Sequence, residues 1–162
     1  MKMRQIVQDT CTRWQILHHS RYVNHREDGP AVIWYNGTRE WWHIGELHRL
    51  DGPAIECANG TREWFRGGFR HREDGPAIER ADGCKSWWYK GKLTRDDGPA
   101  FENPDGTREW YKEGFLHRED GPAIERADGK LIYCYMGVRV DAATMEEFQR
   151  AKDLLIISQI HD

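Results

Sequence analysis

The tetrapeptide Asp-Gly-Pro-Ala occurs five times in this chain of 162 residues, always at a step of 23 residues. The copies begin at Asp28, Asp51, Asp74, Asp97 and Asp120. A fixed internal period of this size is typical of repeat architectures, in which each repeat is one small unit that packs on its neighbours. Because no residue is inserted between copies, the sequence predicts five equivalent units, at 25–47, 48–70, 71–93, 94–116 and 117–139.

Two turn signals divide each repeat. An Asn-Gly or Asp-Gly pair follows the first β-prone run, and a second glycine follows a pair of mostly aromatic residues. Asn-Gly and Asp-Gly between β-prone runs are strong hairpin signals. Two turns in 23 residues leave room for two short strands and for no helix, so we expect an all-β antiparallel meander of five β-hairpin repeats.

Charge pairing selects the length of the hairpin loop. A two-residue loop would place Glu56 opposite Glu63, and like charges that face each other across strands are unfavourable. A loop of three residues ending in glycine opposes unlike charges instead. We therefore expect the pairs Glu56–Arg62, Glu79–Lys85 and Glu102–Arg108.

The paired aromatic residues form two rows, because neighbours in a strand point to opposite faces. The first row is Trp41, Trp64, Trp87, Trp110 and Tyr133, and the second is Trp42, Phe65, Trp88, Tyr111 and Cys134. One row should form a continuous core with Val32, Ile55, Ile78, Phe101 and Ile124. The other either packs as well or forms a binding surface, for which the candidates are Trp42, Phe65, Trp88 and Tyr111.

The segments outside the repeats are expected to cap them. Residues 1–24 contain a degenerate hairpin at 14–24 that would cover the first edge, as repeat arrays require. In residues 140–162, Thr144 and Glu147 fit a capping box that begins a helix reaching about Ile160. The helix is expected to cap the last repeat, or else to form a homodimer through Phe148, Leu154, Leu155 and Ile157.

The recurring order His-Arg-x-Asp-Gly-Pro-Ala, Asp-Gly, Trp and Gly resembles the MORN repeat in a variant form. The resemblance covers 115 of the 162 residues. It implies an elongated meander of β-hairpins that contacts proteins and sometimes lipids, and it implies no enzyme. Repeats of this kind occur in phage, giant-virus and bacterial proteins. The resemblance thus points to a phage-encoded protein that binds and modulates a host protein, such as a component of host defence.

Composition narrows the partner and the compartment. The net charge is −3 with both signs interleaved, which disfavours a non-specific binder of nucleic acid or anionic membranes. No apolar run is long enough for a signal peptide or a membrane span. The four scattered cysteines, with no C-x-x-C pair, suggest reduced thiols and a cytoplasmic protein.

One polar column admits two interpretations. An arginine precedes each Asp-Gly-Pro-Ala by two positions, at Arg26, Arg49, Arg72, Arg95 and Arg118. These side chains are expected to form a ladder of ion pairs with the aspartates or with a neighbouring repeat's glutamate. The alternative is a stripe of guanidinium groups beside aromatic rings, which would bind nucleotides or nucleic acid.

The sequence does not favour catalysis or metal binding. The histidines that begin four repeats would be about 10 Å apart, too far to share one ion, so we expect them to bond turns or stack on rings. Polar residues recur by translation, whereas an active site needs different groups that converge on one point. We expect no enzyme, no cofactor and no metal, and a protein-binding repeat module.

Overall fold

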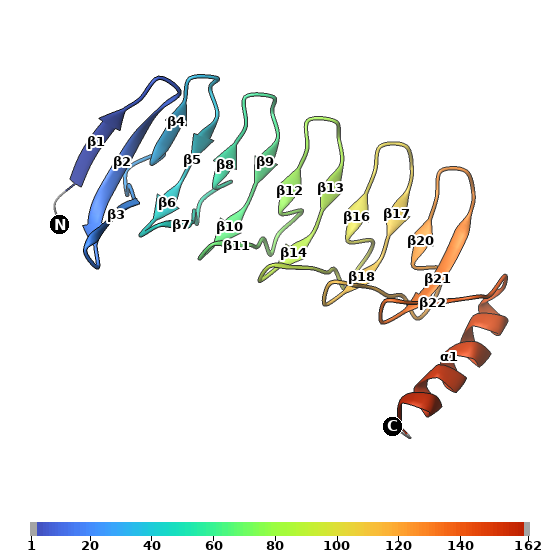
Figure 1. Cartoon of the computed structure of the whole chain (residues 1–162). Coiled ribbons are helices and arrows are strands. Elements are labelled where there is room, and N and C mark those ends of the chain that lie inside the picture. The colour runs from blue at the N-terminus through green and yellow to red at the C-terminus, as the bar shows by residue number, and fades with distance from the viewer. Residues whose placement is uncertain (1–2, 161–162) are drawn as a thin grey trace. The chain divides into compact units, whose positions relative to one another are not determined.

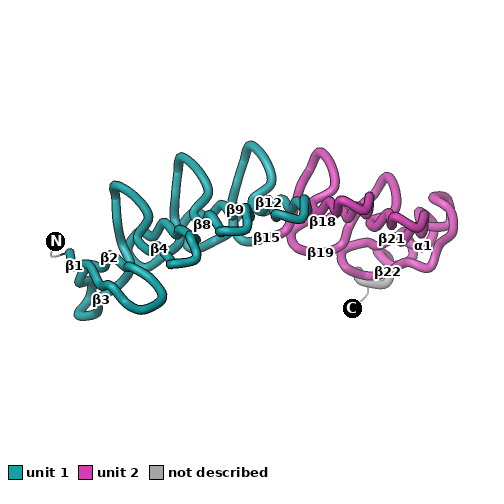
Figure 2. Tube along the Cα trace, turned by 90° about the horizontal axis from the view of Figure 1, so that it is seen from above, with its two compact units in different colours: residues 1–91 teal, residues 92–162 magenta. Residues whose placement is uncertain are grey.

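A computed structural model of the chain, which describes residues 3–160, confirms the all-β antiparallel fold with a C-terminal helix (Figure 1). These residues contain 22 strands and one helix. The chain divides into two compact units, Met1–Gly91 and Lys92–Asp162 (Figure 2).

The first unit is a meander of long hairpins with small hairpins at their bases (Figure 1). It begins with β1 (Met3–Val7), β2 (Cys11–His18) and β3 (Arg21–Asn24). The long hairpins are β4–β5 (Val32–Trp34, Arg39–Glu40), β8–β9 (Ile55–Glu56, Arg62–Glu63) and β12–β13 (Ile78–Glu79, Lys85–Ser86). The remaining strands are β6 (Trp42–His43), β7 (Glu46–Leu47), β10 (Phe65–Arg66), β11 (Phe69–Arg70) and β14 (Trp88–Tyr89). The sheet order is β1-β2-β4-β5-β8-β9-β12-β13, and β3 also pairs with β2.

The second unit repeats this pattern and ends in the helix. Its long hairpins are β16–β17 (Phe101–Glu102, Arg108–Glu109) and β20–β21 (Ile124–Glu125, Leu131–Tyr135). Its other strands are β15 (Lys92–Leu93), β18 (Tyr111–Lys112), β19 (Phe115–Leu116) and β22 (Val138–Val140). The sheet order within the unit is β16-β17-β20-β21-β22.

The long hairpins have the predicted register. Glu56 opposes Arg62, Glu79 opposes Lys85 and Glu102 opposes Arg108. In the β8–β9 loop, the Gly60 N–H donates to the Cys57 carbonyl at 2.9 Å, and Gly60 has φ of +91°. This is the three-residue loop with glycine in the left-handed region, and it confirms that unlike charges face each other across the hairpin.

Each of the first four repeats has four short strands where the sequence predicted two, and the fifth has three. The reason is the first aromatic residue, which leaves the hairpin ladder and bonds to the next repeat. The Trp41 N–H donates to the Ala54 carbonyl at 2.8 Å, and the His48 N–H donates to the Trp41 carbonyl at 3.0 Å. The chain therefore bends at this residue, and the second aromatic residue begins a separate small hairpin.

The core of the repeats is thinner than expected. The alanine of each Asp-Gly-Pro-Ala motif has no exposed surface, at Ala31, Ala54, Ala77, Ala100 and Ala123. Of the aliphatic or aromatic column expected to form the core, Val32 is buried, but Ile55, Ile78, Phe101 and Ile124 are only half-buried. A small side chain is therefore the residue that every repeat buries completely.

The C-terminal helix forms as predicted and packs on the last hairpin. Helix α1 is Met145–Ile160, and the Thr144 hydroxyl accepts a hydrogen bond from the Glu147 N–H at 3.2 Å. Phe148 is fully buried and stacks on Tyr133, with ring centroids 5.1 Å apart. Within residues 3–160, no helix is long and apolar enough to cross a membrane.

Candidate functional site

An arginine lies at the centre of each Asp-Gly-Pro-Ala turn. In the second repeat the Arg49 Nε donates to Asp51 at 3.0 Å, and its Nη1 donates to the Pro53 carbonyl at 3.2 Å and to Glu56 at 3.1 Å. Its guanidinium carbon lies 4.0 Å from the centre of the Trp41 ring, which belongs to the preceding repeat. One cation therefore joins the turn, the following strand and the neighbouring repeat.

The same contacts recur in the other repeats. The arginine Nε donates to the aspartate two residues later at 2.7 to 2.8 Å for Arg26, Arg72, Arg95 and Arg118. Glu79, Glu102 and Glu125 take the place of Glu56. Tryptophan rings lie against the guanidinium groups of Arg26, Arg72 and Arg118, at 4.0 to 4.3 Å, and come from Trp14, Trp64 and Trp110. Each acceptor glutamate belongs to the arginine's own repeat, not to a neighbouring one.

The guanidinium also explains the glycine of the motif. A Cβ atom at Gly52 would lie 3.0 Å from the guanidinium carbon of Arg49, and one at Gly121 would lie 2.8 Å from that of Arg118. Real Cβ atoms essentially never make a contact of 2.8 Å and seldom one of 3.0 Å, and the neighbouring arginine is held by several hydrogen bonds. Glycine is therefore required because the backbone packs directly on the arginine.

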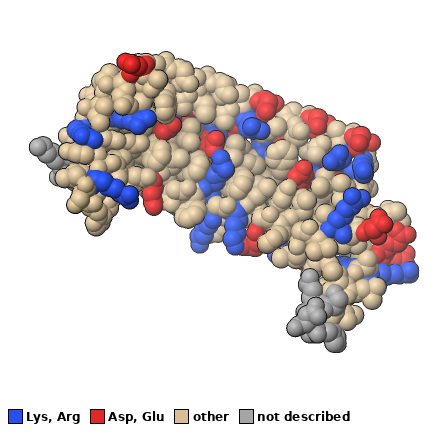
Figure 3. Space-filling view, viewed as in Figure 1, with Lys and Arg blue, Asp and Glu red and all other residues tan. Residues whose placement is uncertain are grey.

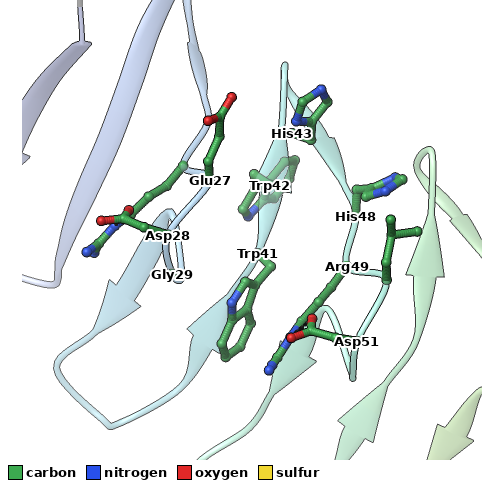
Figure 4. Close-up of a pocket in the computed structure, with 11 residues that line it drawn as sticks. Glu27, Asp28, Gly29, Trp41, Trp42, His43, His48, Arg49 and Asp51 are labelled. Carbon is green, nitrogen blue, oxygen red and sulfur yellow. Dashed lines mark hydrogen bonds and ion pairs between the residues drawn. The ribbon is translucent and has the colours of Figure 1, made fainter.

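Between the first two of these turns lies a groove of about 780 Å³ (Figure 4). Its walls are residues 26–29 of one turn and 49–51 of the next, and Trp41, Trp42, His43 and His48 complete its lining. Figure 4 shows Trp41 between the two Arg–Asp turns. The groove thus combines two indole rings with charged side chains from two repeats.

An equivalent groove of about 550 Å³ lies in the second unit. Its walls are residues 95–98 and 118–120, and its lining is completed by Trp110, Tyr111, Lys112 and His117. Each of these positions lies three repeats after its counterpart in the first groove. The groove is therefore a property of the repeat and recurs at a defined place in it.

The two predicted binding surfaces meet in these grooves. The first groove holds Trp42 of the aromatic row with Arg26 and Arg49, and the second holds Tyr111 with Arg95 and Arg118. The other members, Phe65, Trp88 and Arg72, occupy the corresponding positions of the second and third repeats. The sequence suggested guanidinium groups beside aromatic rings, but not the grooves that the two sets line together.

Three rings of the second aromatic row are half-buried and are held by polar neighbours two residues earlier. The Trp42 indole N–H donates to Glu40 at 2.8 Å, and that of Trp88 donates to Ser86 at 2.8 Å. The Tyr111 hydroxyl donates to Glu109 at 2.8 Å. Burial, together with this hydrogen bond, raises the pKa of Tyr111 far above its ordinary value. These rings are therefore oriented in advance and present fixed surfaces.

The histidines that begin the repeats hold the second turn of the same repeat. The His25 Nδ1 accepts a hydrogen bond from the Ile44 N–H at 3.1 Å, and His48, His71 and His117 accept in the same way from residues 67, 90 and 136. In the fourth repeat the Thr94 hydroxyl accepts from the Glu113 N–H at 3.3 Å. His71 and His117 also lie against tyrosine rings, so both expected roles, turn bonding and stacking, are found.

The electrostatics of the grooves favour neither an anion nor a metal. Two arginines and three carboxylates line the first groove, and the hydrogen bond from each arginine lowers the pKa of its aspartate, so that these carboxylates stay ionised. On the face in Figure 3, acidic and basic side chains are interspersed. Within the part of the chain that is described, no three His, Cys, Asp or Glu side chains are placed to hold a metal ion.

The grooves contain residues that sequence reasoning did not select. Trp41 and Trp110 belong to the row assigned to the core, but both line a groove. Leu50 is 72 % exposed and stands where the other repeats have Glu27, Glu73, Asp96 and Glu119. Its departure from an otherwise acidic column was a signal that could have identified it.

The residues proposed for oligomerisation do not form one exposed surface. Phe148 is buried inside the chain, which corrects the expectation that it contacts a second copy. Leu155 is half-buried, whereas Leu154 and Ile157 are exposed. The helix therefore uses its best apolar residue to cap the last repeat.

No protein-family model matches this chain, and comparison with curated proteins finds none of similar sequence.

Proposed function

We propose that this chain is a MORN-like, non-enzymatic repeat protein of the cytoplasm that binds another protein through the grooves between its Asp-Gly-Pro turns. The observation that carries the proposal is the recurrence of one groove, with the same aromatic and arginine positions, in both units. Trp, Tyr and Arg are the residues that dominate protein–protein binding energy. Repeated grooves suit a partner that offers several contacts in succession.

The fixed side chains of the groove support this proposal. The Trp42 and Tyr111 rings are held by carboxylates two residues earlier in the chain, so little side-chain freedom is lost when a partner binds. Leu50 adds an exposed apolar group at the rim of the first groove. A rigid aromatic wall with an apolar rim is the kind of site into which a partner's side chain packs.

The arginine contacts favour a protein over a nucleic acid as the partner. Each guanidinium already donates to an aspartate, and all but Arg26 also donate to a glutamate. A phosphate would have to compete with these carboxylates, and the exposed aspartates would repel it. The cost of that competition argues against the stripe as a nucleotide site.

We also propose that the protein acts in a reducing compartment and that its partner is a bacterial protein. All four cysteines, which lie within the described residues, are thiols and not disulfides, as suits a reducing compartment. The MORN-like resemblance points to a phage-encoded protein that binds and modulates a bacterial host protein. Bacterial lysates are therefore the first source in which to seek the partner.

The test is affinity capture of the tagged chain from such lysates, with and without nuclease, in matched variants. Leu50→Glu introduces the residue that three other repeats have at this position, and the remaining repeat has aspartate there. The variant should therefore fold normally. Tyr35→Ala, at an exposed position outside the groove, is the control. We expect one protein to co-purify stoichiometrically, to survive nuclease, and to fall at least about tenfold with Leu50→Glu.

Two outcomes would contradict the proposal. Recovery that is equal in Leu50→Glu and Tyr35→Ala would remove the first groove from the interface. Recovery of nucleic acid alone, lost on nuclease treatment, would instead make the arginine stripe the site. Trp42→Ala, checked for folding by circular dichroism, provides a second groove variant.

A further inference from the structure

Strand β1 forms one end of the sheet of the first unit and is paired on one side only. It pairs with β2 in the register Met3↔Ile16 to Val7↔Thr12. Among residues 3–160, no second strand pairs with β1. At five residues it is also longer than the two-residue strands of the repeats. A long edge strand offers a row of N–H and C=O groups to which another strand can pair.

The register shows which backbone groups face outward. The Gln8 N–H donates to the Cys11 carbonyl at 2.9 Å, so this is a hydrogen-bonded pair at the end of the β1–β2 ladder. Hydrogen-bonded and non-hydrogen-bonded pairs alternate in an antiparallel ladder. Ile6 and Arg4 therefore bond to β2, and the N–H and C=O groups of Met3, Gln5 and Val7 point away from it.

The outward N–H and C=O groups of β1 can pair with the same groups of a second copy of β1. If a second copy of β1 lies antiparallel to the first with a two-fold axis at Gln5, then Gln5 opposes Gln5 and each Met3 opposes a Val7. All of these are hydrogen-bonded pairs, because the outward groups of both strands belong to the same three residues. Because β1 has an odd number of residues, a two-fold axis at its central residue lets all the outward N–H and C=O groups of both strands form hydrogen bonds.

Two of the three side chains on one face of β1 are apolar, Met3 and Val7, with Gln5 between them. Met3 is 49 % exposed and Val7 is 65 % exposed, and they lie on the same face as Trp14 and the buried Ile16. The apolar row of β2 therefore continues onto β1 and ends there uncovered. Pairing with a second copy would bring each Met3 beside a Val7 and extend this row.

We propose that the chain forms a homodimer through antiparallel pairing of β1 with β1 of a second copy, with the two-fold axis at Gln5. This places self-association at the N-terminal edge and not at the C-terminal helix. The proposed dimer does not involve the grooves, which are lined by residues 26–51 and 95–120. Since one five-residue strand pair is a small interface, we expect a Kd on the order of micromolar.

The first test measures molar mass by sedimentation or light scattering up to about 100 μM chain, where micromolar association is nearly complete. The wild type should reach the mass of two chains. Gln5→Pro removes one outward N–H and no bond to β2, so it should remain folded and become monomeric. Leu154→Asp combined with Ile157→Asp should leave the dimer unchanged.

The second test uses charge to check the register. Met3→Lys with Val7→Lys places like charges opposite each other and should give a monomer. Met3→Asp with Val7→Lys places opposite charges face to face and should keep the dimer. Thermal unfolding of both variants verifies that each is folded.

Three results would overturn the proposal. They are a monomeric wild type at 100 μM, a dimer that survives Gln5→Pro, and a dimer that is lost only with the helix variant. Equal masses for the two charge variants would reject the two-fold register at Gln5.

Discussion

Arg49 shows how much of a repeat depends on one side chain. It donates hydrogen bonds to the Asp51 and Glu56 carboxylates and to the Pro53 carbonyl. Its guanidinium group also lies against the Trp41 ring and the Gly52 backbone. Its guanidinium is planar and carries five donors, so it can bond in its plane while both faces are packed. The Asp-Gly-Pro turn thus surrounds the arginine that precedes it and holds its guanidinium group in place.

We predict that Arg72→Lys destabilises the protein although the charge is kept. An ammonium group cannot bond Asp74, the Pro76 carbonyl and Glu79 at once while it stacks on Trp64. The free energy of unfolding should fall by about 1–3 kcal/mol, measured by urea denaturation. Arg62→Lys, at an exposed side chain whose nearest carboxylate lies 4.0 Å away, is the control and should change it little.

The histidines make stability depend on pH. Burial and the proximity of His43 lower the pKa of both His25 and His48 from the ordinary 6.5. Glu27 near His25 opposes this effect, whereas Arg66 near His48 adds to it. Each Nδ1 accepts a backbone hydrogen bond, which protonation would remove.

The direction of the effect follows from proton binding. As the pH falls below about 6.5, the unfolded chain binds protons that the folded chain resists, so stability is lost. We predict falling stability as the pH drops below 6.5, before the aspartates titrate. His48→Thr should reduce this slope, because Thr94 holds the equivalent turn without a titrating group. Thermal unfolding at a series of pH values measures it, and an unchanged slope would contradict the prediction.

Among the structural elements, the small hairpins use tight turns with two residues at positive φ. In the first repeat these are Ile44, with φ of +49°, and Gly45, with φ of +84°. A β-branched residue is unfavourable in this region, whereas the second repeat has Gly67 and Gly68 there. The strain is tolerated because His25 bonds the Ile44 N–H.

Ile44→Gly should therefore stabilise the protein, or leave its stability unchanged, despite the greater freedom that glycine gives the unfolded chain. Relief of the left-handed conformation is worth about 1–2 kcal/mol, and the added freedom costs about 0.5–1 kcal/mol. His43→Gly, in strand β6, has no such relief and also loses the ring contacts of His43 with His25 and His48, so it should destabilise. If both variants lose stability equally in urea denaturation, the strain is absent.

The elements also show which features the sequence could reveal. The register at Glu56 and Arg62 was predictable because like charges excluded the alternative, and the helix was predictable from Thr144 and Glu147. The bend at Trp41 was not, because its two hydrogen bonds go to another repeat. The residue that every repeat buries completely is alanine, whereas the isoleucine or phenylalanine that follows it in the later repeats is only half-buried. The arginines could be expected beside aromatic rings, but the grooves could not be predicted, because their walls come from turns of two different repeats.

At the scale of the molecule, the constant step of 23 residues predicts that a whole repeat can be removed. Excision of residues 48–70 joins Leu47 to His71 and puts Arg72 in the place of Arg49 beside Trp41, although the contacts of Arg70 with Glu63 and Trp88 are lost. Nearest-neighbour stabilisation predicts a folded protein of lower stability. Circular dichroism and thermal unfolding would show a cooperative transition at a lower midpoint.

The control is excision of residues 48–69, which is one residue shorter. It shifts the following strands by one position, and a shift of one residue exchanges the two faces of a strand. We expect this variant to unfold or aggregate. Similar behaviour of the two excisions would show that the repeats are not equivalent units.

The arginine-centred turn has a consequence for how the protein responds to heat. Exposure of apolar surface raises the heat capacity on unfolding, and exposure of polar surface lowers it. Repeats that bury alanine completely and build the rest of their interior from guanidinium, carboxylate and half-covered rings expose comparatively little apolar surface when they open. The stability curve of this protein should therefore be broad and shallow, with resistance to cold as well as to warmth.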